Sequence, residues 1–518
     1  MSGASSRRWW ALVAMALSLL VIGLDSTVLN VALPTMALDL HASTSQLQWF
    51  ADAYLLVMSA LLLPAGLLGD KYGRKRLTIG ALSVFGAGSV WCAFAGSATS
   101  LIGARVFLGI GAAVLIPLVM SSVVVLFEPD ERPKAIGVIG AATIVGLPAG
   151  PLVGGALLNH FWWGSVFLIN VPVIAIALIA ASVLLPQDGL SRPGAIDHVG
   201  VGLSAAGLVG LTYGLIEGPV RGWTSAPVMV ALVAGIAMLV AFVRWEARIK
   251  AAEPLMELGL WRNRSFRWGV VGATLANFGL FGVMFVLPQY FRSVTGVDAL
   301  GTGVRTLPLL LGMIVGLQGG MRLAKRIGFA RSATIGFVAL AAGLAVGTTT
   351  GAHTGFALIG TWTALAGFGT GMGLIGAQSA ALNTLEKTRA GAGTAVMQAM
   401  RQVGSVTGIA ALGAVLNGVY RTNIQATGLP NNAASVRDSV ASGVAVGQQL
   451  HVPAVVESAQ NAFATGMDAV LWTSTAVCLA AAILVYLFLP NTGRVAETTN
   501  DAGQSERAVV EAEPQPTA

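Results

Sequence analysis

Charged side chains inside long apolar runs are the residues of this sequence best suited to chemistry. Asp25, Asp52, Arg105 and Arg401 each stand among neighbours that are almost all apolar. Near the centre of a bilayer a charge costs at least about 2.5–3.5 kcal/mol, so each one needs a partner or a function. Burial favours the neutral form of a carboxyl, and a nearby cation favours its charged form. We therefore expect Asp25 to bind and release a proton with Arg105 as its modulator; a static ion pair that only orders helices is the alternative.

The other two charges are more ambiguous. Asp52 lies near the end of its run, where it is either a second carboxylate for a proton or cation or a solvated helix end. Arg401 lies near the middle of its run, and no buried carboxylate is available in the second half of the chain to pair with it. We expect Arg401 to bond to carbonyls and to Gln398 or Gln402 in a structural role; a place in a cavity is the alternative.

The composition of the chain excludes a soluble fold. Of its 518 residues 55% are hydrophobic and 10% are charged, against roughly 25% charged in a typical soluble domain. The 65 glycines suit helices that pack closely in lipid. The net charge of +7 comes from basic residues in short loops, so it does not indicate nucleic-acid binding.

Motifs of other protein classes are missing from the sequence. Cys92 and Cys478 both lie in apolar runs, so neither a disulfide framework nor a cysteine metal site is expected. No GxxxxGK[ST] string supports an ATP-driven pump, and no HExxH or paired Cys/His spacing supports a metal enzyme. We expect no enzymatic activity, no metal and no cofactor.

Fourteen apolar runs are long enough to cross a bilayer core, which takes roughly 20 residues per helix. The first run follows Arg7 and Arg8, but it is too long for a signal peptide and carries Asp25. The sequence therefore predicts an all-α integral membrane protein. The runs are 9–33, 49–68, 77–95, 101–126, 135–158, 165–185, 199–217, 225–243, 268–291, 303–321, 331–349, 355–378, 391–416 and 466–489.

An even number of spans places both termini on one side of the membrane. Most of the 30 Lys and Arg residues lie in the tails and loops of that side, which predicts that it is cytoplasmic. The opposite side carries Arg221, Arg292, Arg305, Arg421 and Arg437.

Two segments outside the spans also carry predictions. Residues 418–465 are expected to form an outer loop, in which 433–449 reads as an amphipathic helix between Pro430 and Pro453. We favour a short helical hairpin over the outer mouth, and a disordered loop is the alternative. The polar tail 491–518 is expected to be disordered.

The loop at residues 66–76 carries the first resemblance to a known family. It reads Gly-Leu-Leu-Gly-Asp-Lys-Tyr-Gly-Arg-Lys-Arg, a tight turn in which glycines let two helices approach. This string resembles the signature loop of the major facilitator superfamily. The resemblance implies gate and conformational roles for Gly66, Gly69, Asp70, Gly73, Arg74 and Arg132.

Further motifs follow in the order expected for the fourteen-helix drug:proton antiporters of that family. Residues 24–34 resemble their first-helix motif, and Arg105 with Gly109 and Gly111 resembles the fourth-helix motif. Gly146, Gly150, Pro151, Gly154 and Gly155 resemble the fifth-helix antiporter motif. Residues 167–172 and 401–404 are similar to the sixth and thirteenth helices. Two departures are Lys325, where the repeated loop usually has an aspartate, and Trp163-Gly164, where an arginine is usual.

The resemblance implies two six-helix bundles, 1–186 and 266–490, with a two-helix insert and linker at 187–265. The bundles would rock about a central site so that it opens to one face at a time. The glycines of the fifth helix would let it act as a seal or hinge; plain close packing is the alternative.

The implied activity is secondary active export of hydrophobic, cationic drugs, dyes or quaternary ammonium compounds in exchange for protons. We expect a monomer in the bacterial cytoplasmic membrane, with a lipophilic small molecule, protons and lipid as its partners. A dedicated exporter of one antibiotic or metabolite and a non-transporting membrane sensor are the alternatives. Candidates for contact with the substrate are Asp25, Asn30, Tyr54, Asn277, Phe278, Phe281, Phe285, Gln289, Tyr290, Phe291, Gln398 and Arg401.

Overall fold

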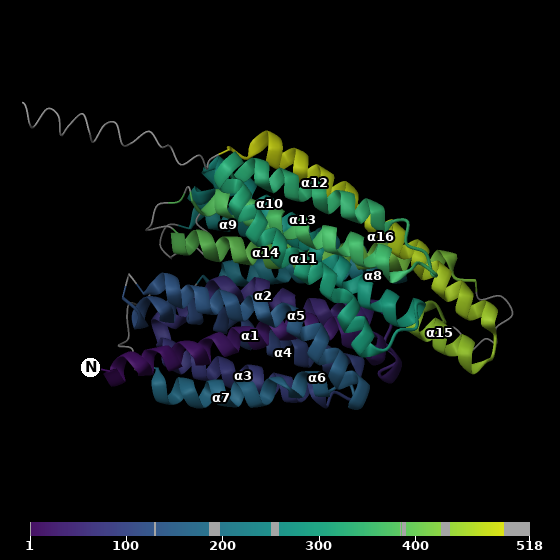
Figure 1. Ribbon diagram of the computed structural model, residues 1–518, viewed down its shortest axis with the longest axis horizontal. Helices are drawn as coiled ribbons and strands as arrows, with labels where there is room; N and C mark the ends of the chain where they lie inside the picture. The colour runs from purple at the N-terminus through teal and green to yellow at the C-terminus, as the bar shows by residue number, and fades with distance from the viewer. Residues whose placement is uncertain are drawn as a thin grey trace, which may run out of the picture.

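The protein, seen here as a computed structural model, is built of helices without strands in the residues that the structure describes. These are residues 2–128, 131–185, 197–249, 258–383, 385, 390–425 and 436–491, and some side chains within helices also lie outside the description. Twelve helical segments of this part are long and apolar enough to span a membrane. Two further helices of 29 residues, α2 (Thr44–Tyr72) and α5 (Arg132–His160), lie among them (Figure 1).

The first group of helices runs from α1 to α7. Here α1 packs against α5 and α7, and α2 and α3 both pack against α4. Ser43 forms a capping box at the start of α2, and Ser97 caps α4, so both begin at a side chain that accepts a bond from the backbone. The other members of the group are α1 (Ser2–Asp39), α3 (Arg74–Ala93), α4 (Ala98–Leu126), α6 (Ser165–Leu168) and α7 (Asn170–Leu184).

The second group contains α10 to α16. Here α13 packs between α11 and α12, and α14 packs against α10 and α16. Asn263 caps α10 and Asp298 caps α11. The members are α10 (Arg264–Gln289), α11 (Ala299–Ile327), α12 (Phe329–Gly347), α13 (Phe356–Leu382), α14 (Ala390–Asn423), α15 (Val440–Gln449) and α16 (Pro453–Phe488), with short turns at η1 (Leu258–Arg262) and η2 (Tyr290–Val294).

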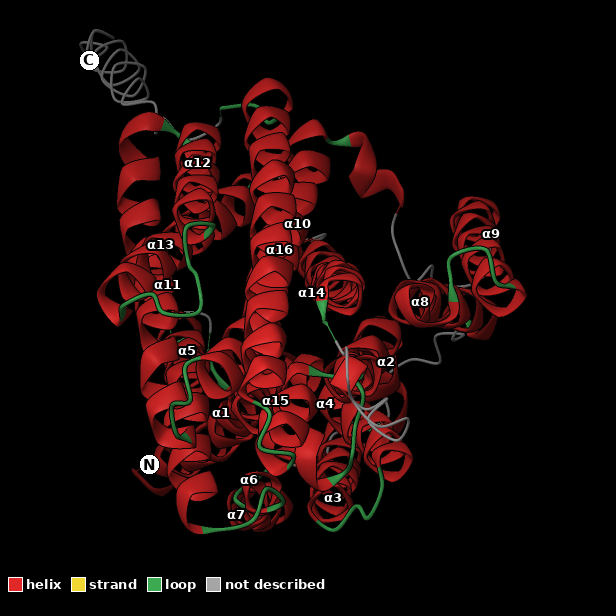
Figure 2. Ribbon diagram, turned by 90° about the vertical axis from the view of Figure 1, so that its right-hand side faces the viewer, coloured by secondary structure: helices red, strands yellow, loops and turns green. Residues whose placement is uncertain are grey.

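Helices α8 (His198–Arg221) and α9 (Ala226–Arg248) pack against each other and project from the side of the molecule (Figure 2). α8 contacts α2 of the first group and α14 of the second. Most side chains of α9 are exposed, as expected for a helix that faces lipid on most of its surface.

The two groups meet at one end of the molecule. We call this the α15 end, and we call the opposite end, where α1 begins and α16 finishes, the terminal end (Figure 1). At the α15 end, the backbone N–H and the hydroxyl of Thr44 both donate to the carbonyl of Asp438, at 2.8 and 2.7 Å. The amide of Asn159 donates to Asp298 at 2.6 Å, which joins α5 to the start of α11.

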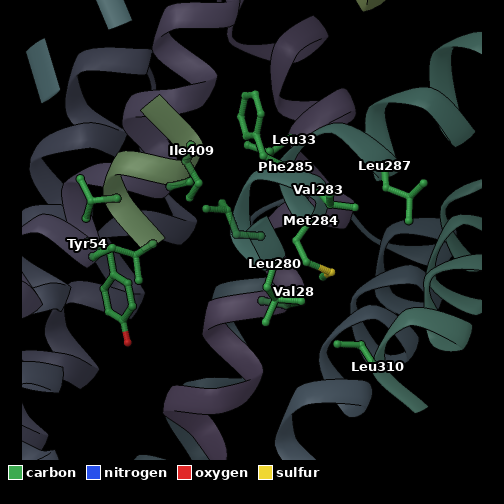
Figure 3. Packing of buried hydrophobic residues seen from close by; sticks show 14 of the residues in the cluster. Val28, Leu33, Tyr54, Leu280, Val283, Met284, Phe285, Leu287, Leu310 and Ile409 are labelled. Carbon is green, nitrogen blue, oxygen red and sulfur yellow. The ribbon is translucent and has the colours of Figure 1, made fainter. Parts of the chain in front are cut away.

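A hydrophobic seam continues this junction into the core. Val28 and Leu33 of α1 lie beside Leu280 and Phe285 of α10, where the two groups meet (Figure 3). These side chains are buried, so water is excluded along this part of the junction.

Each predicted membrane run overlaps an observed helix, but several helices extend well beyond their run, and the outer loop is shorter than predicted. The prediction of a loop over 418–465 is wrong at both ends, because α14 continues to Asn423 and α16 begins at Pro453. Hydropathy marks only the apolar part of a helix, and both extensions carry polar residues. The predicted helix within 433–449 is present as α15, which forms a hairpin with the start of α16. The tail 492–518 lies outside the described residues.

Candidate functional site

A small pocket lies where both helix groups contribute side chains. Ser26 and Asn30 of α1, Tyr54 of α2 and Arg105 of α4 line it from the first group. Phe281 of α10 and Ile409 of α14 line it from the second, and Tyr54 and Ile409 lie close together in Figure 3. A pocket between two helix groups changes shape whenever the groups move relative to each other.

The charge pair at this pocket is fully buried. The Arg105 Nη1 atom lies 2.7 Å from the Asp25 Oδ2 atom, and the two side chains are 2% and 0% exposed. The Nε–H of Arg105 donates to the carbonyl of Phe50 at 2.9 Å. The predicted contact between Asp25 and Arg105 is thus confirmed, and the pair ties together α1, α2 and α4.

Three further side chains support this pair. The amide of Asn170 donates to Asp25 Oδ1 at 3.4 Å and to Ser89 Oγ at 3.3 Å. The guanidinium carbon of Arg105 lies 4.4 Å from the centre of the Tyr54 ring and 6.0 Å from that of Phe167. Sequence reasoning missed these supporting roles; the polar Asn170 within an apolar run is the signal that could have found one of them.

The close packing of α5 on α1 fixes the position of Asp25 relative to α5. A Cβ atom on Gly146 would lie 2.7 Å from the carbonyl oxygen of Leu20, and one on Gly150 would lie 2.9 Å from that of Leu24. One turn further, a Cβ on Gly154 would meet the side chain of Val28. Any side chain at these positions would push α5 away from the turn of α1 that carries Asp25. The close approach predicted for these glycines is confirmed.

Pro151 and Gly155 of the same predicted motif face the second helix group instead. A Cβ on Gly155 would lie 2.7 Å from the backbone of Ala299 and Leu300 in α11, and a Cβ on Gly303 would meet the carbonyl of Pro151. The fifth-helix motif therefore contacts α1 on one side and α11 on the other.

Asp52 is buried and has no hydrogen-bond partner among the described residues for either carboxyl oxygen. It follows Gln48 by one helical turn, so the two side chains share a side of α2. The amide of Gln48 donates to the carbonyls of Ile409 and Ala410, both at 3.2 Å, which places that side of α2 against α14. The alternative prediction of a solvated helix end at Asp52 is wrong, because its exposure is 0%.

Arg401 has few partners. Its Nη1 atom donates to Gln398 Oε1 at 3.1 Å, as predicted, and its Nε atom has no partner among the described residues. The side chain of Asn277 on α10 bonds to the Arg401 carbonyl at 3.2 Å and to Ser405 Oγ at 3.3 Å. These bonds hold the backbone of α14 against α10 but leave the guanidinium itself weakly held.

Of five further residues predicted to contact the substrate, three line the pocket. Asn30, Tyr54 and Phe281 line the pocket, whereas Phe278 packs against Gly408 of α14. Tyr290 does not line it: its hydroxyl donates at 2.7 Å to the carbonyl of Gly351, in the turn between α12 and α13. Tyr290 therefore lies at a packed end of the second helix group, and its contact with a substrate stays a prediction.

Gly73 separates α2 from α3 with a positive φ of 89°, so a residue with a side chain would be strained in the predicted tight turn. Arg74 begins α3. The surroundings of the other predicted gate residues lie outside what the structure describes; these are Gly66, Gly69, Asp70 and Arg132.

The chain is similar to known transport proteins over most of its length. Residues 15–409 match the family model described as Major Facilitator Superfamily. The chain is 32% identical to the multidrug efflux pump LfrA of Mycolicibacterium smegmatis, over 93% of this chain and 96% of that protein. It is 30% identical to the tetracenomycin C resistance and export protein of Streptomyces glaucescens, over 93% of this chain and 91% of that protein.

The fold agrees with these similarities. A bacterial homologue of the human lysosomal transporter Spinster, solved in an inward-facing, unoccupied conformation, superimposes with a TM-score of 0.65. The match covers 95% of this chain and 99% of that one at 17% identity, so it concerns the fold alone. With its apolar helices, its inter-group pocket and its family match, this chain belongs to the Major Facilitator Superfamily and is a multi-pass membrane transporter, not an enzyme.

Proposed function

We propose that the protein is a proton-coupled secondary exporter of hydrophobic drugs. The observation that carries this proposal is the Asp25–Arg105 pair, which is buried beside a pocket that both helix groups line. When Asp25 binds a proton, the Coulomb attraction to Arg105 is lost and the link between α1 and α4 weakens. Proton binding and the arrangement of the two helix groups are then thermodynamically linked, which is the requirement for exchange transport.

Asp52 is the second proton carrier in this proposal. An ionised carboxylate without any partner is too costly inside a membrane, so the buried side chain is stable here only in its neutral, protonated form. It lies on the side of α2 that faces α14. Separation of α2 from α14 would expose Asp52 to water and allow its proton to exchange.

The hydrogen bonds that join the two groups at the α15 end favour access to the pocket from the terminal end. We infer that the terminal end faces the cytoplasm of a bacterial cell, as the loop charges predict. The glycines of α5 would let α1 and α11 slide along it as the groups rock.

The architecture proposed for this cycle has fourteen spans. Helices α2 and α5 add two spans to the twelve candidates, since each is long enough to cross a bilayer core. Helices α1 to α7 and α10 to α16 form the two moving bundles, and α8 with α9 forms an insert beside α2 and α14. A monomer driven by the proton gradient needs no cofactor in this scheme.

Tyr54 and Phe281 support hydrophobic, aromatic substrates. Aromatic rings attract cations, so they also support the predicted preference for cationic dyes and quaternary ammonium compounds. Similarity to a multidrug efflux pump supports a broad substrate range, whereas similarity to a tetracenomycin C export protein supports export of one antibiotic or metabolite.

The test is dye transport by the purified protein in lipid vesicles with an imposed pH gradient. We expect ethidium to move against its gradient only while the pH gradient lasts, and to stop when an ionophore collapses it. Asp25→Asn should abolish this transport. Asp39→Asn, an exposed aspartate at the end of the same helix, should transport like the wild type. Gradient-driven transport that persists in Asp25→Asn would overturn the proposed role of the pair.

A further inference from the structure

The charges on the helices that line the pocket do not balance. Away from helix ends, α1, α2, α4, α10 and α14 carry four charged side chains in the described residues: Asp25, Asp52, Arg105 and Arg401. Asp25 and Arg105 neutralise each other at 2.7 Å. Asp52 has no partner among the described residues and is stable there only with a proton bound. The charge that remains is the positive charge of Arg401.

An arginine cannot relieve this imbalance alone. A carboxyl group in an apolar site becomes neutral by taking up a proton, but a guanidinium keeps its charge under all ordinary conditions. The hydrogen bond to Gln398 supplies a dipole and not a counter-charge, and no described residue accepts a bond from the Nε–H. In a low-dielectric interior such a cation strongly favours an anion beside it.

The position of Arg401 places this cation within reach of a bound substrate. Arg401, Ser405 and Ile409 follow each other at intervals of four residues, so they form one stripe along α14. Ile409 lines the pocket, and Arg401 lies two turns nearer to the terminal end, roughly 12 Å along the helix axis. The side chain of Arg401 is only partly buried, as it would be beside a hollow between the two groups.

We propose that Arg401 binds an anionic group, a carboxylate or an ionised phenol, on an aromatic substrate whose ring system occupies the pocket beside Tyr54 and Phe281. This inference rests on the proposed function and adds anionic aromatic substrates to the cationic dyes proposed there. A planar guanidinium offers two parallel N–H donors to a carboxylate, which adds orientation to the charge attraction. A substrate about 12 Å long, aromatic at one end and acidic at the other, spans this distance.

Two xanthene dyes of similar size and opposite charge test the proposal by binding alone. Fluorescein is an anion and rhodamine 123 is a cation, and fluorescence anisotropy reports the dissociation constant of each for the purified protein in lipid nanodiscs. We expect the wild type to bind fluorescein more tightly than rhodamine 123. Arg401→Gln should weaken fluorescein binding roughly ten- to a hundredfold and leave rhodamine 123 within about twofold. Arg401→Lys should keep part of the fluorescein affinity.

Arg267→Gln is the matched control, because it removes the same charge from an exposed position on α10. It should leave both dissociation constants unchanged. The proposal is overturned if the wild type does not bind fluorescein, if Arg401→Gln affects both dyes equally, or if it affects neither. Failure of the proposed export activity is a separate result, because it appears as missing gradient-driven dye movement in vesicles while the binding difference between the dyes is unaffected.

Discussion

Each half of the molecule holds one arginine inside its membrane helices near the pocket, and the two have opposite surroundings. Arg105 donates to Asp25 and to the Phe50 carbonyl and lies over the Tyr54 ring. Arg401 donates to the neutral Gln398 and has an Nε atom without a partner in the described residues. The first half therefore contains its own counter-charge, whereas the second half leaves a positive charge for something else to neutralise.

This difference suggests that the two halves bind different partners. A complete pair that also contacts Asn170 and Tyr54 can respond to a proton, because protonation changes contacts that already exist. An incomplete site responds to a ligand, because the ligand supplies the missing contact. Proton binding and substrate binding are thus assigned to different halves of the fold and are coupled through the pocket between them.

The largest effect should come from breaking the complete pair. Asp25→Asn leaves the guanidinium of Arg105 buried without a counter-charge, so we expect a loss of roughly 3–5 kcal/mol in stability. Arg105→Gln should cost less, since Asp25 can then take up a proton. Arg401→Gln should be neutral or stabilising, because it removes a charge that has no counter-charge among the described residues. Thermal unfolding of the purified variants in one detergent gives this order, and equal losses for Asp25→Asn and Arg401→Gln would contradict the comparison.

A second prediction disturbs the packing beside the pair. Gly150→Ala places a Cβ against Thr27 and within 2.9 Å of the Leu24 carbonyl, so it should destabilise the protein by about 1–3 kcal/mol and lower gradient-driven transport. Gly80→Ala on α3 is the control, because no atom lies within 4 Å of its added Cβ. If both variants unfold at the same temperature, the close contact of α5 with α1 does not fix the position of Asp25.

The third prediction compares the two supporting asparagines. Asn170→Ala removes the bonds to Asp25 and Ser89, and Asn277→Ala removes those to the Arg401 carbonyl and Ser405. Each should cost about 0.5–1.5 kcal/mol in stability. Only Asn170→Ala should shift the pH dependence of transport, because only Asn170 contacts the proposed proton site. A shift of the same size in Asn277→Ala would contradict the assignment of proton binding to the first half alone.

The smallest effect concerns the contact between the halves at the α15 end. The hydrogen bond from Asn159 lowers the pKa of Asp298, and the backbone N–H of Gly301 lowers it further. A carboxyl whose pKa is lowered by folding stabilises the contact above its unfolded value of about 3.9 and loses this stabilisation as the pH falls through the lower, folded value. Acid should therefore loosen the α5–α11 contact, measured as the labelling rate of Leu300→Cys relative to that of a fully exposed thiol at the same pH, because the reactivity of any thiol falls in acid. With Asp298→Asn added, this relative rate should not change across the range; a pH dependence that persists would exclude Asp298 as its source.

Sequence reasoning predicted the helices and the Asp25–Arg105 contact because each depends on a local or strongly constrained signal. A run of apolar residues defines a membrane helix, and a buried charge demands a partner of opposite sign. The same reasoning failed for the ends of α14 and α16, since polar residues beyond the membrane continue a helix without a hydropathy signal. It also did not predict the bond of Tyr290 to Gly351, because the sequence does not show which residues meet at the end of a helix.

The burial of Asp52 and the support from Asn170 depend on long-range packing. Asp52 is inaccessible because α2 packs against α4, α8 and α14, three helices that are distant in the sequence. Asn170 reaches Asp25 across 145 positions of the chain. Such contacts follow only from the relative placement of the helices.

The most direct test of proton coupling through Asp25 separates exchange from gradient-driven transport. The double variant Asp25→Asn/Arg105→Gln keeps the site neutral and hydrogen-bonded, so it avoids the unpaired charge of the single change. In vesicles without a pH gradient, we expect it to exchange internal for external ethidium at a rate close to that of the wild type. With an imposed pH gradient, we expect it to accumulate no dye. Accumulation of dye in the double variant at the wild-type level would contradict the assignment of coupling to this pair. If the double variant neither exchanges nor accumulates dye, the pair has only a structural role.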